Sequence, residues 1–290
     1  MPRVAVVRGD GIGPEVIDAA LGELPADTTL VDIDLGAERY LATGDLLTDE
    51  DLATIAGCDA LLLGAVGDPR VPDGVLERGV LLRLRKELDL YANVRPFPEL
   101  DLVFVRENTE GLYAGVSERT ATRALETSVN TWAAIERCAR FAFELAETRR
   151  GHLTLAHKRN VLSAAGGLWT EVTEKVASDH PEVELVYAHA DAAAYHLVVD
   201  PARFDVILTD NLFGDVLSDV AAGVAGGLGS AASANLHPDP RTRPTSCIGL
   251  FEPVHGSAPD IAGTSTADAT AAIRAARMLC DTLSKEGVTT

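Results

Sequence analysis

The sequence contains few lysines and few cysteines. Only four of its 25 basic residues are lysines, at positions 86, 158, 175 and 285, so each lysine is more distinctive than a typical arginine. The four cysteines are scattered and form no C-x-x-C pair or short Cys/His cluster: Cys58, Cys138, Cys247 and Cys280. This spacing indicates neither a disulfide framework nor a zinc site. We expect the cysteines to be small buried side chains or unreactive thiols.

Long apolar runs, repeats and flexible linkers are also absent. No stretch approaches the roughly 18 to 20 uncharged apolar residues of a membrane span. Arg3, Arg8 and Asp10 interrupt the N-terminal region, where a signal peptide would be apolar. We therefore expect a cytoplasmic protein. No Pro/Gly/Ser-rich linker separates two halves, so the chain of a two-domain protein would cross between its domains more than once.

The net charge narrows the classes of partner. The chain carries 25 basic and 44 acidic residues, a formal charge of −19, which repels nucleic acid and anionic membrane surfaces. Disorder is excluded by a hydrophobic content of 47% over 290 residues, which is enough for one large core or two modest ones. We expect a small-molecule substrate, with no nucleic acid and no membrane as partner.

Short apolar runs alternate with longer amphipathic segments, which predicts an α/β fold. Strands are expected at residues 4–7, 60–63, 102–105, 153–156, 185–188 and 206–209. Helices are expected at residues 14–24, 131–148, 167–178, 215–225 and 270–283. Between residues 111 and 130 the pattern changes to Gly, Ser, Thr and alternating charge, which predicts a protruding hairpin arm of the kind used for oligomerisation.

A glycine-rich segment at residues 9–15 resembles a dinucleotide fingerprint but does not fit it. The motif G-x-G-x-x-G starting at Gly9 requires glycine where Pro14 stands, and proline suits the first turn of a helix. A second near match at residues 227–232 follows a helical pattern and not a strand. We therefore expect a tight strand-to-helix turn at residues 9–15, which is compatible with cofactor contact but is not an ordinary Rossmann motif.

Arginines and paired carboxylates suggest a site for an acidic substrate. Arg85, Arg95 and Arg106 lie in or near apolar segments, and Arg106 directly follows a strand, where α/β proteins bind ligands. The alternative for each is a salt-bridged surface residue. Asp215 and Asp219 are spaced to share one helix face near its positive end and would repel without a cation between them.

A hard divalent cation, Mg²⁺ or Mn²⁺, would satisfy these carboxylates, with Asp191 as a possible third ligand. The alternative is a helix cap and a solvent-exposed aspartate. Lys158 follows a strand and adjoins Arg159, whose charge favours a neutral lysine that can act as a base. Tyr113 is a candidate proton donor. Taken singly, each of these two residues is also compatible with a structural role.

Six segments together resemble the isocitrate/isopropylmalate dehydrogenase family of metal-dependent β-decarboxylating dehydrogenases. They span residues 9–15, 84–96, 105–113, 157–162, 209–219 and 251–263, the last reading FEPVHGSAPDIAG. The resemblance implies a two-domain α/β fold with a non-Rossmann cofactor site and a cleft between the domains. It also implies a first, cofactor-side domain of residues 1–90 plus 227–290 and a second domain of residues 91–226 with the arm and the dimer interface.

The resemblance also implies functions for individual residues. Arg85, Arg95 and Arg106 would bind the carboxylates of a malate, Asp191, Asp215 and Asp219 would bind Mg²⁺ or Mn²⁺, Lys158 would act as base and Tyr113 as acid. The implied cofactor is NAD, contacted by Glu252, His255, Gly256, Ser257, Ala258, Asp260 and Ile261, with Asn160 and Asn211 as weaker candidates. Asp260 favours NAD, because a carboxylate accepts from a ribose 2′-hydroxyl and repels a 2′-phosphate. Lys158 and Asp191 would reach the site from the neighbouring subunit of a homodimer.

Leu81 and Leu82 resemble the isopropylmalate branch of the family, in particular its actinobacterial type, because isocitrate enzymes carry a polar pair there. An apolar lining suits an isopropyl group, whereas a third carboxylate needs a cation. The expected reaction is NAD-dependent oxidative decarboxylation of 3-isopropylmalate to 2-oxoisocaproate. Arg78 and Arg83 flank the leucines and keep other 3-substituted malates, including homoisocitrate, isocitrate, benzylmalate and tartrate or malate, as alternatives.

Three features depart from the family pattern. The connection at residues 96–105 is short, Asp268-Ala269 replaces a usual Asn-Pro pair, and the sequence ends soon after the expected last helix. These departures suggest a shortened member of the family and keep a non-catalytic subunit as a further alternative. Every expected catalytic position is nevertheless occupied.

Overall fold

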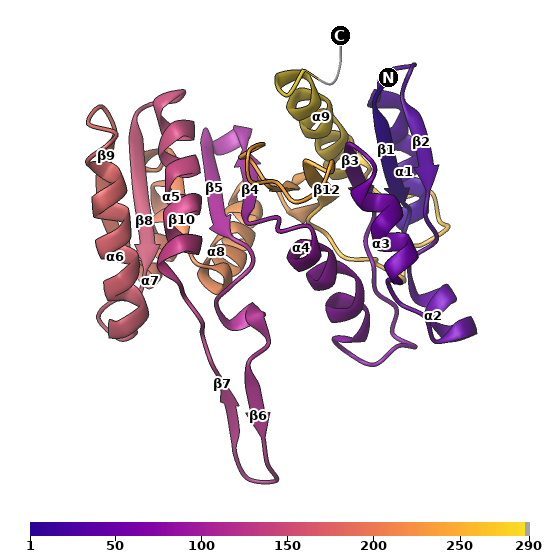
Figure 1. Ribbon diagram of the computed structural model, residues 1–290, viewed down its shortest axis with the longest axis horizontal. Coiled ribbons are helices and arrows are strands. Elements are labelled where there is room, and N and C mark those ends of the chain that lie inside the picture. Colours follow the sequence, from indigo (N-terminus) through magenta and orange to yellow (C-terminus); the bar gives the residue numbers. More distant parts are fainter. Residues whose placement is uncertain (288–290) are drawn as a thin grey trace. The chain divides into compact units, whose positions relative to one another are not determined.

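The computed structural model describes residues 1–287 of the chain and has an α/β fold (Figure 1). Its described residues divide into two compact units, one formed by residues 1–90 and 227–287 and the other by residues 91–226. The chain therefore leaves unit 1 after Leu90 and returns to it at Gly227. Within the described residues, no helix has the length and apolar character required to cross a membrane.

Unit 1 is built on a sheet with strand order β2-β1-β3-β12-β11, in which only β11 runs antiparallel to its neighbour. Its strands are β1 (Arg3–Val7), β2 (Thr29–Asp32), β3 (Ala60–Leu63), β11 (Ala232–Leu236) and β12 (Gly249–Pro253). Its helices are α1 (Gly13–Ala20), α2 (Ala37–Thr43), α3 (Asp49–Ala56), α4 (Arg83–Glu87) and α9 (Thr270–Lys285). A π-helix (Glu77–Leu82) leads directly into α4.

Both faces of the central strands β1, β3 and β12 are covered, as their apolar side chains require, whereas the edge strand β2 is largely exposed. Ala5 and Val7 of β1 join a fully buried core with Ile55 of α3 and Leu84 of α4. Helices α1 and α9 pack against each other, and α9 also packs on β12 and β11. Burying these strands and helices fixes the loops at the strand ends, where the candidate cofactor residues lie.

Unit 2 has strand order β4-β5-β10-β8-β9, with β4 antiparallel to β5 and the others parallel. The strands are β4 (Ala92–Phe97), β5 (Leu102–Glu107), β8 (His152–His157), β9 (Glu184–His189) and β10 (Val206–Thr209). Helices α5 (Trp132–Glu147) and α6 (Ser163–Ala177) pack on one face around buried Phe143 and Trp169. Helices α7 (Ala190–Val199) and α8 (Asn211–Val224) pack together on strands of the same sheet.

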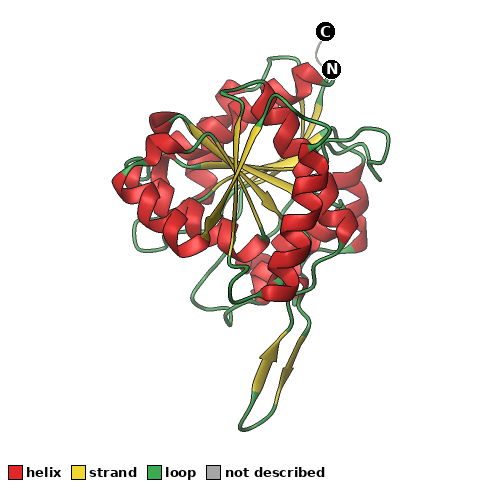
Figure 2. Ribbon diagram, turned by 90° about the vertical axis from the view of Figure 1, so that its left-hand side faces the viewer, coloured by secondary structure: helices red, strands yellow, loops and turns green. Residues whose placement is uncertain are grey.

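The predicted arm is confirmed as a hairpin of unit 2. Strands β6 (Ser117–Arg119) and β7 (Ala124–Glu126) pair antiparallel with each other, and every residue in them is exposed. Figure 2 shows the two strands extending away from the helices and strands as a separate ribbon. An isolated bridge between Gly111 and Val129 closes the base of the arm.

All six predicted strands are confirmed, as is the helix at residues 131–148, which forms α5. Two predicted helix starts were four residues too late: α6 begins at Ser163 instead of 167, and α8 at Asn211 instead of 215. Asp210 explains the second error, because its carboxylate caps α8 by accepting the Phe213 N–H at 2.8 Å. The first helix ends at Ala20 and continues only as a short 3-10 turn to Glu23.

The sequence pattern missed four strands and several helices, namely β2, β4, β11, β12, α2, α3, α4 and α7. Strand β4 contains Arg95 and Pro96, and α7 is alanine-rich, so neither shows the expected periodicity. The short connection after β4 is a 3-10 turn (Pro98–Leu100) followed by Asp101 in a left-handed conformation. The connection thus needs no further secondary structure to join β4 to the antiparallel β5.

Candidate active site

Two aspartates on consecutive turns of α8 lie against arginines from the unit 2 sheet. Arg95, on β4, donates to Asp215 Oδ1 and to Asp219 Oδ1, both at 3.2 Å, and to the Ser218 hydroxyl at 2.8 Å. The Arg95 side chain is 7% exposed. The Arg95 guanidinium therefore contacts both aspartates and offsets part of the repulsion between them.

Arg106, at the carboxyl end of β5, contacts the same aspartate. Its guanidinium forms a short ion pair with Asp215 Oδ1 and donates twice to Asn211 Oδ1, at 3.0 and 2.7 Å. The Tyr113 hydroxyl donates to Asp215 Oδ2 at 2.7 Å, and the Arg106 guanidinium carbon lies 5.1 Å from the Tyr113 ring centroid. The structure thus brings six predicted site residues together: Arg95, Arg106, Tyr113, Asn211, Asp215 and Asp219.

Gly214 permits the close approach of Arg106 to α8. A Cβ atom at this position would lie 2.6 Å from Arg106 Cγ and 2.8 Å from its Cβ. Because Arg106 is 1% exposed, its side chain has little room to move. The glycine in the segment Asn211-Leu-Phe-Gly-Asp215 therefore has a packing reason that its sequence position alone did not show.

The sequence predicted that Asp215 and Asp219 lie near the positive end of their helix, and the observed start of α8 at Asn211 shows that this is wrong. Asp215 lies one turn into the helix and Asp219 two turns in, whereas the dipole effect is confined to the first turn. Asp215 is also not the cap, since Asp210 has that position. Burial raises the pKa of Asp219, Arg95 lowers it, and Asp215 raises it through like charge, with burial the largest effect. The arginines, and not the dipole, compensate this pair of charges.

Lys158 and Asp191 form a second group in unit 2. The Lys158 ammonium makes a short ion pair with Asp191, which is 70% exposed, and this hydrogen bond lowers the pKa of the Asp191 carboxyl. Lys158 is thus paired with a carboxylate, whereas the sequence considered alone placed only the cation of Arg159 beside it. Among residues 1–287, no group of three metal-ligating side chains is assembled, so Asp191 does not join Asp215 and Asp219 within one chain.

Tyr187, on β9, was not predicted and holds the turn that carries Lys158. Its hydroxyl donates to the His157 carbonyl at 2.8 Å and accepts the Arg159 N–H at 2.9 Å. These groups belong to the peptide units before and after Lys158, so one hydroxyl fixes both. The Arg159 guanidinium carbon lies 3.9 Å from the Tyr187 ring centroid. No sequence signal indicated this contact, because it depends on the pairing of β8 with β9.

Replacing Tyr187 with phenylalanine is expected to lower kcat by about tenfold, since removing the hydroxyl leaves two backbone groups without their partner. KM should change much less, because Tyr187 contacts none of the three arginines proposed to bind the substrate, Arg85, Arg95 and Arg106. Tyr40→Phe is the matched control, since no hydrogen bond within residues 1–287 involves that hydroxyl. Steady-state kinetics on both variants test this, and equal kcat values for Tyr187→Phe and wild type would refute it.

In unit 1, Arg85 and Glu252 form a buried ion pair at 3.0 Å. Asn235 donates to the same Glu252 oxygen at 2.9 Å, whereas Arg85 Nε is buried without a hydrogen-bond partner. Leu81 packs against the unit 1 core, and Leu82 lies beside it at the end of the π-helix without joining that cluster. Both leucines are half-buried.

The candidate cofactor loop after β12 packs against the turn at residues 9–13. The Ile12 N–H donates to the Ser257 carbonyl at 2.8 Å. Gly11 has φ of +57°, and a Cβ atom there would lie 2.0 Å from the same carbonyl oxygen. Ala258 is also left-handed, at φ of 39°. His255 Nδ1 lies 3.0 Å from the Gly256 carbonyl oxygen, and His255 Nε2 is buried without a partner.

The structure gives the remaining cofactor candidates different surroundings. Asp260 and Ile261 lie in the turn that continues the loop, and the Ile261 N–H donates to the Ala258 carbonyl at 3.2 Å. Asn160 is exposed in the turn after Lys158. Asn211 lies within the arginine cluster, where its amide accepts from Arg106 and donates to the Glu110 carbonyl at 3.0 Å. A cofactor contact of either asparagine stays a prediction.

Glu107 follows Arg106 and is buried. Burial raises the pKa of its carboxyl, although the N–H and hydroxyl of Thr109 and the N–H of Glu110 donate to it and lower the pKa. Because the folded pKa is raised, the folded state retains the Glu107 proton to higher pH than the unfolded state. The stability contributed by this group therefore falls as the pH rises from its ordinary pKa of about 4.3 towards the folded value.

We expect the free energy of unfolding of Glu107→Gln, relative to wild type, to increase over that pH interval and to level off above it. The glutamine cannot ionise, so the pH-dependent part of the difference reports on Glu107, whereas the changed hydrogen bond adds a constant offset. Urea unfolding of both proteins between pH 4 and 8 measures this difference in the free energy of unfolding. A difference that stays constant over this range would contradict the prediction.

Comparisons with known proteins agree with this fold. The family model for isocitrate/isopropylmalate dehydrogenase matches residues 3–287. A 3-isopropylmalate dehydrogenase of Rhodococcus opacus is 51% identical, with 98% of this chain and 90% of the relative covered. One of Corynebacterium efficiens is 53% identical, with coverages of 98% and 88%.

The solved structures that match nearly the whole chain include two dehydrogenases. An isocitrate dehydrogenase from Methylococcus capsulatus has a TM-score of 0.88 and 38% identity, covering 99% of this chain and 86% of that chain. A β-decarboxylating dehydrogenase from Thermococcus kodakarensis, in its apo form, has a TM-score of 0.80 and 40% identity, with coverages of 98% and 84%. The fold and these relatives indicate a decarboxylating dehydrogenase. The chain belongs to the isocitrate/isopropylmalate dehydrogenase family, as its motifs predicted.

Proposed function

We propose that the protein catalyses the NAD-dependent and metal-dependent oxidative decarboxylation of 3-isopropylmalate to 2-oxoisocaproate. The observation that carries this proposal is the cluster of Arg95, Arg106 and Tyr113 around Asp215 and Asp219. Guanidinium groups bind the carboxylates of a malate, and the adjacent aspartates suit the cation that such a substrate needs. The names of the relatives support the choice within the family.

The surroundings of Leu82 support an apolar substituent at C3 of the substrate. Leu82 is half-buried, so part of its surface is available to a ligand. The neighbouring Arg83 donates to Asp49 at 2.6 Å and to the Leu47 carbonyl. An arginine engaged in this way is less available to a third carboxylate, which favours isopropylmalate over isocitrate.

The residues present fit a hard divalent cation. Asp215 and Asp219 supply carboxylate oxygens on one helix face, and within residues 1–287 no group donates to Asp219 Oδ2. Asp191 would complete the set from a neighbouring subunit. Mg²⁺ or Mn²⁺ bound there would neutralise the aspartates and stabilise negative charge on the substrate oxygens.

The residues after β12 fit NAD. The conformation of this loop is constrained, because Ala258 has a left-handed backbone and Ser257 packs closely on Gly11. The loop also contains a buried atom, His255 Nε2, that has no hydrogen-bond partner among the described residues. The remaining proposed contacts are Glu252, Gly256, Asp260 and Ile261. NAD bound at this loop would accept the hydride, and Asp260 would disfavour the 2′-phosphate of NADP.

In the proposed reaction, Arg85, Arg95 and Arg106 bind the two malate carboxylates and fix the C2 hydroxyl. Lys158 takes the hydroxyl proton as the hydride leaves C2, which gives a 2-oxo acid with a carboxylate on C3. The C3 carboxylate then leaves as CO₂, and its bonding electrons form an enolate. Tyr113 protonates C3 and thereby releases 2-oxoisocaproate.

We also propose a homodimer with shared active sites. The Lys158–Asp191 pair is not assembled with the Asp215–Asp219 pair in one chain, although the reaction needs both. Helices α7 and α8 expose several apolar side chains that a second copy of this chain would cover. They are Tyr195 at 63%, Val198 at 60%, Val199 at 54%, Val216 at 55% and Val224 at 38%.

NADH production from a panel of substrates tests the activity. The panel contains 3-isopropylmalate, isocitrate, homoisocitrate, 3-benzylmalate, malate and tartrate, each with Mg²⁺ or Mn²⁺, with EDTA and NADP⁺ as controls. We expect a signal with 3-isopropylmalate and NAD⁺ that EDTA abolishes. A stronger signal with another member would overturn the substrate, and no signal from a folded dimer would overturn the activity.

A further inference from the structure

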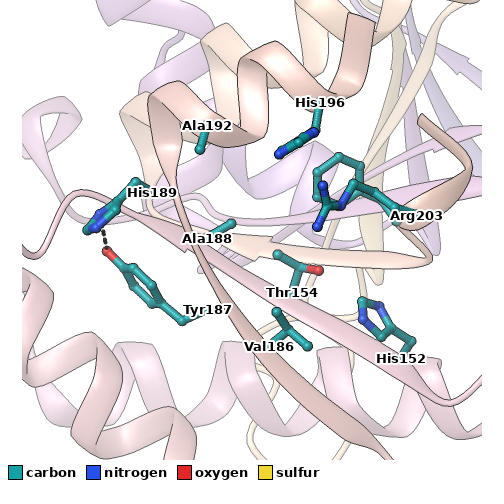
Figure 3. A pocket seen from close by; sticks show the side chains of 10 residues that line it. His152, Thr154, Val186, Tyr187, Ala188, His189, Ala192, His196 and Arg203 are labelled. Carbon is teal, nitrogen blue, oxygen red and sulfur yellow. Dashed lines mark hydrogen bonds between the residues drawn. The ribbon is translucent and has the colours of Figure 1, made fainter. Parts of the chain in front are cut away.

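Unit 2 contains a pocket to which none of the proposed substrate, metal or cofactor residues contributes. Its volume is about 480 Å³, within the range of small-molecule sites. The pocket lies between helix α7 and strands β8 and β9, and its lining side chains surround one space (Figure 3). Thr154 of β8 pairs in register with Val186 of β9, which places both on the sheet side of this space.

Several hydrogen-bond donors of the pocket have no partner in the part of the chain that the structure describes. Arg203 is exposed and forms no ion pair or side-chain hydrogen bond there; its nearest ring is that of Phe204, at 5.9 Å. Thr154 is 2% exposed, yet no hydrogen bond involves its hydroxyl. The imidazole nitrogens of His196 are similarly unpaired, and His152 Nδ1 is buried without a partner.

The charge of the lining favours an anion. No aspartate or glutamate lines the pocket, although acidic residues outnumber basic ones by 44 to 25 in the sequence. The unpaired Arg203 therefore lies in a concave region where no carboxylate of the lining neutralises it. A guanidinium in this position binds a carboxylate with two parallel hydrogen bonds.

The rest of the lining favours a compact apolar group. Val186, Ala188 and Ala192 line the pocket with the ring of Phe204. Small aliphatic side chains on the sheet and helix leave space for a branched body of a few carbon atoms. A single guanidinium among such residues suits a carboxylate better than a phosphate, which usually requires several N–H donors.

We propose that this pocket binds a small monocarboxylate with a compact apolar body. The carboxylate contacts Arg203, with Thr154 or His196 donating a further hydrogen bond, and the body packs on Val186 and Ala192. This site is additional to the proposed dehydrogenase activity, and neither proposal requires the other.

Isobutyrate is a suitable probe, and isobutylamine is the control with the same body and the opposite charge. We expect isobutyrate to shift the imidazole NMR signals of His152 and His196 in full-length protein in a saturable manner. Isobutylamine should leave them unchanged. Arg203→Gln should weaken binding by about 10-fold to 100-fold, the cost of a charged hydrogen bond.

Two further variants make the experiment specific to the pocket. Ala192→Leu fills part of the space without changing charge and is expected to weaken binding as well. Arg241→Gln removes an arginine whose side chain is 87% exposed and which does not line the pocket, so it should bind isobutyrate like wild type. An absence of saturable shifts, or equal affinity in wild type and folded Arg203→Gln, would overturn the proposal.

Discussion

Lys158→Met is expected to lower kcat by about 100-fold to 10,000-fold, the usual contribution of a positioned acid or base. Methionine preserves the length and apolar part of the side chain but cannot take a proton. The Lys158 contact with Asp191 shows that its ammonium reaches another predicted site residue. Substrate binding should persist, because the arginine cluster around Asp215 does not include Lys158.

Lys175→Met is the matched control for Lys158→Met. The Lys175 ammonium lies 4.8 Å from the Trp132 ring centroid and contacts no proposed site residue. Steady-state kinetics should therefore show wild-type activity for Lys175→Met. Comparable activity for Lys158→Met and the control would remove Lys158 from the proposed mechanism.

Mixing chains that carry only Lys158→Met with chains that carry only Asp215→Asn tests whether active sites are shared between subunits. Each homodimer would lack an essential group in both sites. A mixed dimer would contain one site with Asp215 from one chain and Lys158 from the other. Random pairing should then restore roughly one quarter of the wild-type activity, because half of the dimers are mixed and each has one intact site. No recovery in verified mixed dimers would place both residues in the site of one chain.

Gly11→Ala is expected to cause the largest loss of cofactor binding. The new Cβ would overlap the Ser257 carbonyl oxygen, which is backbone and cannot rotate away, and Gly11 has a positive φ of +57°. We expect unit 1 to lose about 1 to 3 kcal/mol of stability. The Kd for NADH should rise at least about tenfold, because the loop carrying His255 and Ser257 must shift. Urea unfolding and fluorescence titration with NADH measure the two effects.

Gly22→Ala controls for the loss of glycine itself. No atom lies within 4 Å of a Cβ placed at Gly22, and its φ is not in the left-handed region. The substitution should leave NADH binding unchanged and should be neutral or stabilise the fold by less than about 1 kcal/mol. If Gly11→Ala behaved like this control, the packing of residues 9–13 on the loop would not govern cofactor binding.

The sequence alone determined the α/β class, six strands and the family. Apolar runs of four residues, such as those of β3 and β10, predict strands of a parallel sheet, because such a sheet buries both faces of its strands. The motifs around Arg106, Asp215 and His255 identified the family because they resemble its pattern in residue type and local spacing, and the family model confirms that identification. The hairpin arm was predictable because its polar segment between apolar elements cannot form a core.

Only the tertiary structure decided which charged groups meet. The segments carrying Arg95, Arg106 and Asp215 are separated by up to 120 residues, and sheet pairing brings them together. Three further features could not be predicted from the sequence. They are the residue at which α8 begins, the hydrogen bonds of Tyr187 to the turn that carries Lys158, and the close packing of Gly214 and Gly11 against neighbouring segments. Local patterns encode which face of an element is buried, but contacts between distant segments depend on packing, which no local pattern specifies.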